Sequence, residues 1–213
     1  MFVQVLLPGL IAFGAAWAGA YFAFRYQNKK VEEQETTSEI AAINMVVITL
    51  GQMQNALANY KKQILDEHPA NPLRAFSMQP ATIGNYSHLV LHSDSLVFLC
   101  ETDHRQIPMT VGYMNTQFHR AVAAIDDRNN HHLTVVQPKM AAFAAPPATA
   151  LTDAIVLRAL GIDQKRIQES YTDNMYLQVE SALDDIQKCK NDLQAAAKTL
   201  YPKGRTVTSR IEN

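Results

Sequence analysis

The chain opens with a long run of apolar residues that carries no charged side chain. Residues 1–24 read MFVQVLLPGLIAFGAAWAGAYFAF, and 19 of these 24 residues are apolar. A helix of this length is about 36 Å long, which exceeds the roughly 30 Å hydrocarbon core of a bilayer. The pattern therefore predicts a transmembrane anchor over residues 1–25.

A cleaved signal peptide is the alternative interpretation of this run. The Ala-Gly-Ala triplet at 18–20 resembles a cleavage site. A signal peptide, however, carries a positive segment ahead of its apolar core, and none precedes Phe2. The apolar run also continues through Phe24 before Arg25 follows. An uncleaved signal-anchor therefore fits the sequence better.

Residues at the C-terminal end of the span predict its orientation. Arg25, Lys29 and Lys30 follow the span, and no Lys or Arg precedes it. Trp17 and Tyr21 lie near this basic end, where aromatic rings prefer the interface between lipid and water. The positive-inside rule then places the N-terminus outside and the C-terminal domain in the cytoplasm. We expect the protein to lie in a bacterial inner (plasma) membrane, with the bilayer and its headgroups as its first partner.

Small residues form two neighbouring ridges on the span. Ala12, Ala16 and Ala20 recur at every fourth position, and Ala15 and Gly19 lie on the adjacent ridge. Such ridges let two helix backbones approach closely in lipid. We expect the span to pack against a second copy of the chain or against another membrane protein. The alternative is that Ala and Gly are simply common in transmembrane helices.

Apolar residues recur at every third or fourth position in three later segments, which predicts three long helices. The first helix is expected over 38–67, after a polar juxtamembrane stalk at 26–37 that either continues the anchor as a helix or forms a linker. The second is expected over 105–137, and the third begins at a capping Asp163 and ends before Pro202. The three apolar stripes run from Ile43 to Ile64, from Val111 to Val136 and from Met175 to Leu200, and the second becomes less apolar at Asn129 and His132.

Two shorter helices are predicted between the long ones, near 95–101 and over 150–160, where Gly161 ends the second. Residues 68–94 should be irregular, and the Ala/Pro-rich stretch at 141–150 is the best candidate for a hinge or loop. No segment alternates apolar and polar residues as a strand would. We therefore predict an all-α protein: a transmembrane helix followed by an antiparallel helical bundle or coiled coil of three long and two short helices. This domain would cover 38–202, ahead of a polar tail at 203–213.

Composition narrows the possible functions. The net charge of −1 excludes a strongly basic nucleic-acid binder as the default, and we predict no nucleic-acid partner. The two cysteines exclude a secreted scaffold held by disulfides. The sequence contains no Walker A pattern, no Gly-x-Gly-x-x-Gly and no Gly-x-Ser-x-Gly. We therefore predict no catalytic residue and no cofactor.

The seven histidines all lie between positions 68 and 132, which makes a metal site the obvious enzymatic alternative. His88 and His92 are four residues apart, and Glu101 and His104 match one Glu-x-x-His pair of the kind that binds iron in helical bundles. His131 completes the candidates. The second Glu-x-x-His pair is missing, and no His-Glu-x-x-His or Cys-x-x-Cys occurs. We therefore predict no metal site and keep these five residues as the candidates if one exists.

Several segments follow one another along the chain in an order that can be compared with other proteins. An uncharged span and a stalk helix precede DSLVFLCETDH (94–104), RNNHHLTVVQP (128–138) and LYPKG (200–204). This order resembles a group of uncharacterised bacterial single-pass membrane proteins with a cytosolic helical domain. The resemblance implies the same architecture and brings no activity or site residue with it.

We therefore expect a single-pass membrane-anchored helical protein that acts by self-association or partner binding rather than by catalysis. One alternative is an extracytoplasmic helical sensor on a reversed anchor. The other is a helical-bundle metalloprotein that uses the His-rich middle segment.

Overall fold

Helix is the only regular secondary structure in the part of the chain that the structure describes. The computed structural model describes the backbone of residues 2–67, 71–81, 84, 86–143, 150–202 and 204, and their side chains from residue 16 onward. The all-α prediction is confirmed. The α-helices are α1 (Phe2–Tyr60), α2 (Arg74–Ser77), α3 (Ile107–His131), α4 (Gln137–Ala142), α5 (Asp153–Leu160) and α6 (Ile162–Leu200). The other helical segments are the π-helical turns η1 (Lys61–Leu65) and η3 (His132–Val136) and the 3₁₀ helix η2 (Ser93–Glu101).

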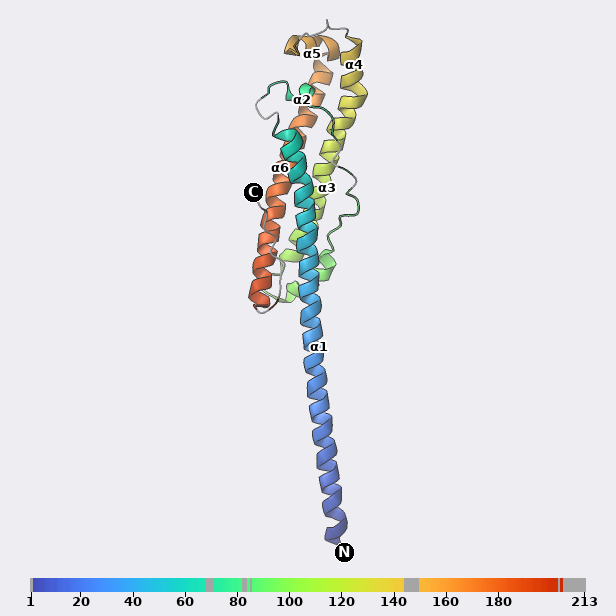
Figure 1. Ribbon diagram of the computed structural model, residues 1–213, viewed down its shortest axis with the longest axis vertical. Helices are drawn as coiled ribbons and strands as arrows, with labels where there is room; N and C mark the ends of the chain where they lie inside the picture. Colours follow the sequence, from blue (N-terminus) through green and yellow to red (C-terminus); the bar gives the residue numbers. More distant parts are fainter. Residues whose placement is uncertain are drawn as a thin grey trace.

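Helix α1 joins the predicted anchor, the stalk and the first helix of the body into one unbroken helix of 59 residues. Of the two alternatives for the stalk, the structure has the helix that continues the anchor, and residue 38 marks no helix boundary. No Gly or Pro interrupts residues 25–38. Lys29 Nζ lies 3.8 Å from a Glu33 carboxylate oxygen, and Thr37 Oγ1 donates to Glu33 O, so both contacts have the i, i+4 spacing of a continuous helix. Figure 1 shows the N-terminal half of α1 extending beyond all the other helices.

The three long helices α1, α3 and α6 lie side by side and share one hydrophobic core (Figure 1). The three predicted stripes face this core, except for the last part of the second stripe, where Val136 belongs to a separate apolar cluster. Leu50, Phe118 and Ile186 are fully buried at its centre. Removal of this apolar surface from water is the main force that holds the body together.

The three long helices do not all alternate in direction, as a fully antiparallel arrangement would require. Helix α6 runs antiparallel to α1, since Tyr60 contacts Met175 at one end of the body and Glu39 contacts Tyr201 at the other. Helices α1 and α3 run in the same direction (Figure 1). The reason is that the described segments between α1 and α3 bring the chain back to the end where α1 enters the body before α3 begins. We call that end proximal and the opposite end distal.

The second predicted helix continues beyond the boundary expected at Gln137 and Pro138. Helix α3 passes through η3 into α4, which ends at Ala142. Proline lacks an N–H group, and its ring crowds the preceding helical turn. The wider π-helical turn η3 lies directly before Gln137 and Pro138, and it accommodates the proline without ending the helix.

The shorter elements match the predictions closely. Helix η2 covers the segment expected near 95–101, and α5 is capped by Thr152, whose Oγ1 accepts the Ile155 N–H at 3.3 Å. Gly161 ends α5 as predicted, with φ 75° and ψ 165°. Asp163 lies in the first turn of α6 and is not its N-cap, since Gly161 occupies that position.

Two smaller differences concern the irregular parts. Helix α2 is a single turn inside the segment that we expected to be irregular, and η1 ends two residues before the predicted helix end at 67. In the predicted loop at 141–150, residues 144–149 lie outside the described part of the chain, as do residue 203 and residues 205–213 of the predicted tail.

Candidate functional site

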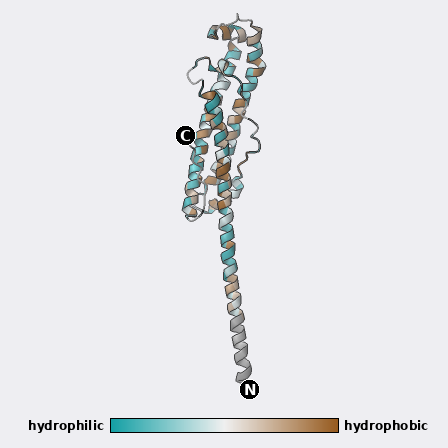
Figure 2. Cartoon of the chain, in the orientation of Figure 1, coloured by the Kyte–Doolittle hydropathy of each residue, from teal (hydrophilic) through white to brown (hydrophobic). Residues whose placement is uncertain are grey.

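The predicted topology and headgroup residues lie on the part of α1 that projects from the body. Arg25, Lys29 and Lys30 are exposed. Trp17 and Tyr21 are 65% and 49% exposed, and their rings stack at a centroid distance of 5.8 Å. Figure 2 shows a hydrophilic stretch of α1 between this aromatic region and the body. The segment therefore has the order of apolar, aromatic, basic and polar residues that an anchor and stalk require.

The small-residue ridges are open in the single chain. Ala16, Gly19 and Ala20 are exposed, and a Cβ atom added at Gly19 would meet no other atom within 4 Å. Ala12 and Ala15 belong to α1 but lie outside the residues whose side chains are described. The described members of both ridges are therefore available to a second helix.

One helix within the described side chains, Ala16–Leu65, is long and apolar enough to cross a membrane by length and composition. Core helices of soluble proteins and signal sequences meet the same criterion, and the C-terminal half of this helix is packed into the body. The exposed apolar residues ahead of the body therefore give weak support to membrane anchoring.

The candidate metal ligands do not come together. His88 and His92 are exposed on the segment before η2, Glu101 and His104 lie at the proximal end, and His131 lies at the distal end of α3. His131 is bound by two amide side chains of α6. Among the described residues, no group of three or more His, Cys, Asp or Glu side chains could hold a metal ion.

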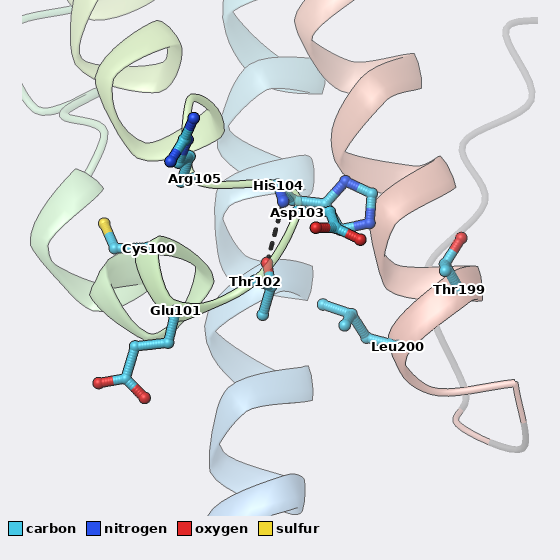
Figure 3. A pocket seen from close by; sticks show the side chains of 8 residues that line it. All are labelled: Cys100, Glu101, Thr102, Asp103, His104, Arg105, Thr199 and Leu200. Atoms are coloured by element: carbon cyan, nitrogen blue, oxygen red, sulfur yellow. Dashed lines mark hydrogen bonds between the residues drawn. The ribbon is translucent and has the colours of Figure 1, made fainter.

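Glu101 and His104 line a surface cavity of about 460 Å³ at the proximal end (Figure 3). Figure 3 shows Glu101 pointing away from His104 and from the end of α6. The reason lies in the backbone, because η2 ends at Glu101 and Thr102 is extended, with φ −114° and ψ 176°. Thr102 Oγ1 then accepts the His104 N–H at 3.1 Å. The i, i+3 spacing of a regular helix, on which the pairing depended, is absent at this point.

The remaining lining of the proximal cavity mixes charges of both signs. Asp103 and Arg105 are exposed, and Thr199 and Leu200 close the cavity from the side of α6. Cys100, also exposed, lies on the same rim. With Glu101, the lining has two carboxylates and one guanidinium, a mixture of charges that shows no cluster of one sign for binding an anion or a cation.

A buried polar layer at the distal end is the feature that the sequence analysis missed. We call the polar layer the side chains of Arg128, Asn129, His132, Gln168 and Thr172, each 5% exposed or less. Along α3 it follows the main core and precedes Val136, and along α6 it precedes Met175. Beyond it lies a second, smaller apolar cluster, whose buried members are Ala75, Phe76, Val136, Val156 and Leu160.

Arg128 and its neighbours bind the returning chain through its backbone. Arg128 Nη2 donates to Ala75 O at 3.1 Å and to Met78 O at 2.6 Å. Asn129 Nδ2 donates to Ala81 O at 2.7 Å. Gln168 Nε2, from α6, donates to Ala75 O at 3.0 Å. Residues 75–81 are therefore held against α3 and α6 by side chains that reach their carbonyl groups.

The electrostatics of the polar layer are unusual because Arg128 is buried without a carboxylate partner among the described residues. Its guanidinium bonds only carbonyl oxygens, and its Nε has no partner. Burial lowers the pKa of Arg128. Burial, together with the Arg128 charge, lowers the pKa of His132 to about 4, so this imidazole is neutral at neutral pH. Burial raises the pKa of the neighbouring Tyr60 to about 12.

This arrangement positions backbone and offers no obvious reaction. Its groups are a guanidinium, two amides, a hydroxyl and a neutral imidazole, and none of these exchanges a proton near pH 7 in this environment. One signal in the sequence indicated the layer. The apolar stripe of α3 continues through Asn129 and His132, so two polar residues occupy positions that face the interior.

No protein-family model matches the chain, and no curated protein or solved structure matches it either.

Proposed function

We propose that the protein is a single-pass membrane protein that holds a helical body at the cytoplasmic face of a bacterial inner membrane and acts by association. In this proposal α1, α3 and α6 form a bundle domain, and the span packs against a second copy of the chain or against another membrane protein. The observation that carries the proposal is the continuity of α1, whose N-terminal part exposes apolar residues while its C-terminal part supplies the core of the body.

This continuity couples the span to the body mechanically. The exposed stalk, residues 26–37, would separate the two by about 18 Å at 1.5 Å per residue. No flexible linker intervenes in α1. At the proximal end Tyr201 Oη donates to Glu39 Oε2 at 2.6 Å, which fastens the end of α6 to α1 where α1 leaves the body. A partner bound to the span would therefore be held at a defined distance and orientation from the body.

The single tryptophan of the chain gives a direct test of the anchor. Trp17 lies in the predicted span, so its fluorescence reports this segment alone. In vesicles that contain lipids brominated on the acyl chains, we expect quenching of the emission of the full-length protein. The protein should also stay with membranes in alkaline carbonate and leave them only in detergent. Unquenched emission together with release by carbonate would contradict the anchor.

The orientation is tested by reporters fused to the C-terminus. A cytoplasmic reporter should be active, and a reporter that matures only outside the cytoplasm should be silent. The opposite result would favour the reversed anchor with an extracytoplasmic sensor domain.

Association through the ridges is tested by energy transfer between labelled copies in vesicles. Gly19→Leu places a bulky side chain on a ridge. It should abolish the energy transfer that the wild-type copies show at the same ratio of protein to lipid. Ala18→Leu adds similar bulk off the two ridges and is the matched control. Equal effects of the two substitutions would show that the ridges are not the contact. Where the wild-type chain gives no transfer by itself, cross-linking in cells should capture a different membrane protein, and Gly19→Leu should weaken that product.

A further inference from the structure

We propose that the distal end of the body opens as a separate unit and that the hydrogen bonds of the polar layer hold it closed. The distal cap consists of α2, η3, α4 and α5. In the closed form observed, Arg128, Asn129 and Gln168 hold the carbonyl groups of residues 75–81. In the open form these bonds are released and the small apolar cluster separates from the body. This behaviour is independent of where the anchor lies.

The first observation is that the cap has its own apolar cluster. Phe76, Val136 and Val156 are buried with one another and belong to a cluster distinct from the main core. The polar layer lies between the two clusters. Apolar contacts that would join the cap to the body are therefore replaced at this level by hydrogen bonds, which contribute less net stability than a continuous core.

The second observation concerns the backbone at the boundary. The chain enters the cap from α1 through η1 and a turn at 66–67, and it enters from α3 through η3, so both long helices change to π-helical geometry at this level. It leaves α5 through Gly161, whose φ of 75° lies in the left-handed region. Non-α geometry within helices is a common site of bending. These helical connections to the cap therefore contain points at which the chain can bend.

The third observation is that the hydrogen-bonding groups of the polar layer are not all satisfied. Arg128 carries a buried charge that faces no carboxylate among the described residues, and its Nε has no hydrogen-bond partner. A buried donor without an acceptor raises the free energy of the closed form relative to an open form in which water reaches it. The closed and open forms are thereby brought closer in energy, as a two-state element requires.

The chain contains a natural reference for the test. Cys189 is 2% exposed in the main core, so the rate at which it reacts with a thiol reagent reports opening of the body. Exposed Cys100 is first removed by Cys100→Ser. A probe thiol is then introduced into the cap by Val156→Cys, and separately into α2 by Ala75→Cys. Rates in the full chain in detergent are normalised to the rates of the same thiols in denaturant.

We expect both probe thiols to react at least tenfold faster than Cys189, and at rates that match each other. Arg128→Met, which removes the charge and the fork of donors, should accelerate both probes several-fold further without accelerating Cys189 equally. Lys190→Met is the matched control. Among the described residues it removes the other buried cation, which lies outside the cap, and it should leave the reaction rates of the probes unchanged.

Three results would overturn the proposal. Probes that react only as fast as Cys189 would mean that the cap opens only with the body. A thiol at 75 that reacts fast while the thiol at 156 does not would mean that only the 75–81 segment opens. Unchanged rates for both probes in Arg128→Met would mean that Arg128 does not hold the cap closed. If Arg128→Met fails to fold, Asn129→Ala removes the single bond to Ala81 O and must accelerate both probes.

Discussion

Lys190 Nζ donates a 2.6 Å hydrogen bond to Gln54 Oε1 across the interface between α6 and α1. Both side chains are buried, and burial lowers the pKa of Lys190. Gln54 Nε2 donates in turn to Gln187 Oε1 at 2.7 Å. The partner of this buried ammonium is therefore an amide oxygen. A polar pair within an otherwise apolar seam favours one register of two helices over the neighbouring registers.

Gln54→Leu should destabilise the body strongly. The substitution leaves the Lys190 ammonium buried without its acceptor, and the loss of one partner of a buried charge costs about 3 kcal/mol or more. The measurement is chemical unfolding of the detergent-solubilised full chain, followed by circular dichroism. Gln54→Leu combined with Lys190→Met replaces both polar groups by apolar ones and should recover most of the loss. A double variant as unstable as Gln54→Leu alone would show that the pair is not what Gln54 stabilises.

Sequence patterns predicted the elements well because apolar periodicity directly reflects which side of a helix is buried. The three stripes face the core, and Gly161 ends α5 as its conformational freedom allows. The polar composition of 26–37 left open whether this stalk is a linker or a continuation of the anchor helix. Polarity marks exposure and not the end of a helix, and no Gly or Pro occurs in 26–37, so α1 continues through the stalk.

The distal site could not be predicted in the same way. Arg128 lies one position from the α3 stripe, and the groups that it binds are backbone carbonyls about fifty residues earlier in the chain. Backbone carbonyls are common to all residues and leave no sequence pattern. The metal candidates failed for a different reason, since the spacing of Glu101 and His104 assumes a regular helix where the structure has the end of a 3₁₀ helix.

His132 should make the protein less stable as the pH falls below 6.5. In the unfolded chain this imidazole binds a proton near pH 6.5, whereas in the folded protein burial and the Arg128 charge lower its pKa to about 4. The unfolded state therefore binds more protons between these values, and stability is lost across that window, by about 3 kcal/mol in total. The measurement is the free energy of unfolding at several pH values from 7 to 4.

His132→Gln removes this titration and is the control. Its unfolding free energy should change less than that of the wild type between pH 6.5 and 5, above the range in which carboxylates take up most of their protons. Parallel curves for the two proteins would contradict the assignment to His132.

Alanine at two glycines should have opposite effects. Gly161 has φ 75° and ψ 165°, a conformation that is almost restricted to glycine, so Gly161→Ala should cost roughly 1–3 kcal/mol. Gly51 lies within α1, and Gly51→Ala should stabilise the helix by roughly 0.5–1 kcal/mol. An added Cβ would meet no atom within 4 Å at either position, so the difference isolates the backbone. Thermal unfolding midpoints that shift in the same direction would contradict this explanation.

Tyr201→Phe should weaken the contact between the end of α6 and α1 at the point where α1 leaves the body. Tyr201 Oη donates to Glu39 Oε2 at 2.6 Å, and burial and this carboxylate both raise the pKa of Tyr201. Loss of a hydrogen bond to a charged group should reduce the free energy of unfolding by about 1.5–3 kcal/mol. Glu39→Gln keeps an acceptor and should lose less. The double variant separates the pair from its surroundings, because a coupling energy near zero between the two positions would mean that the joint between α1 and α6 depends on packing alone.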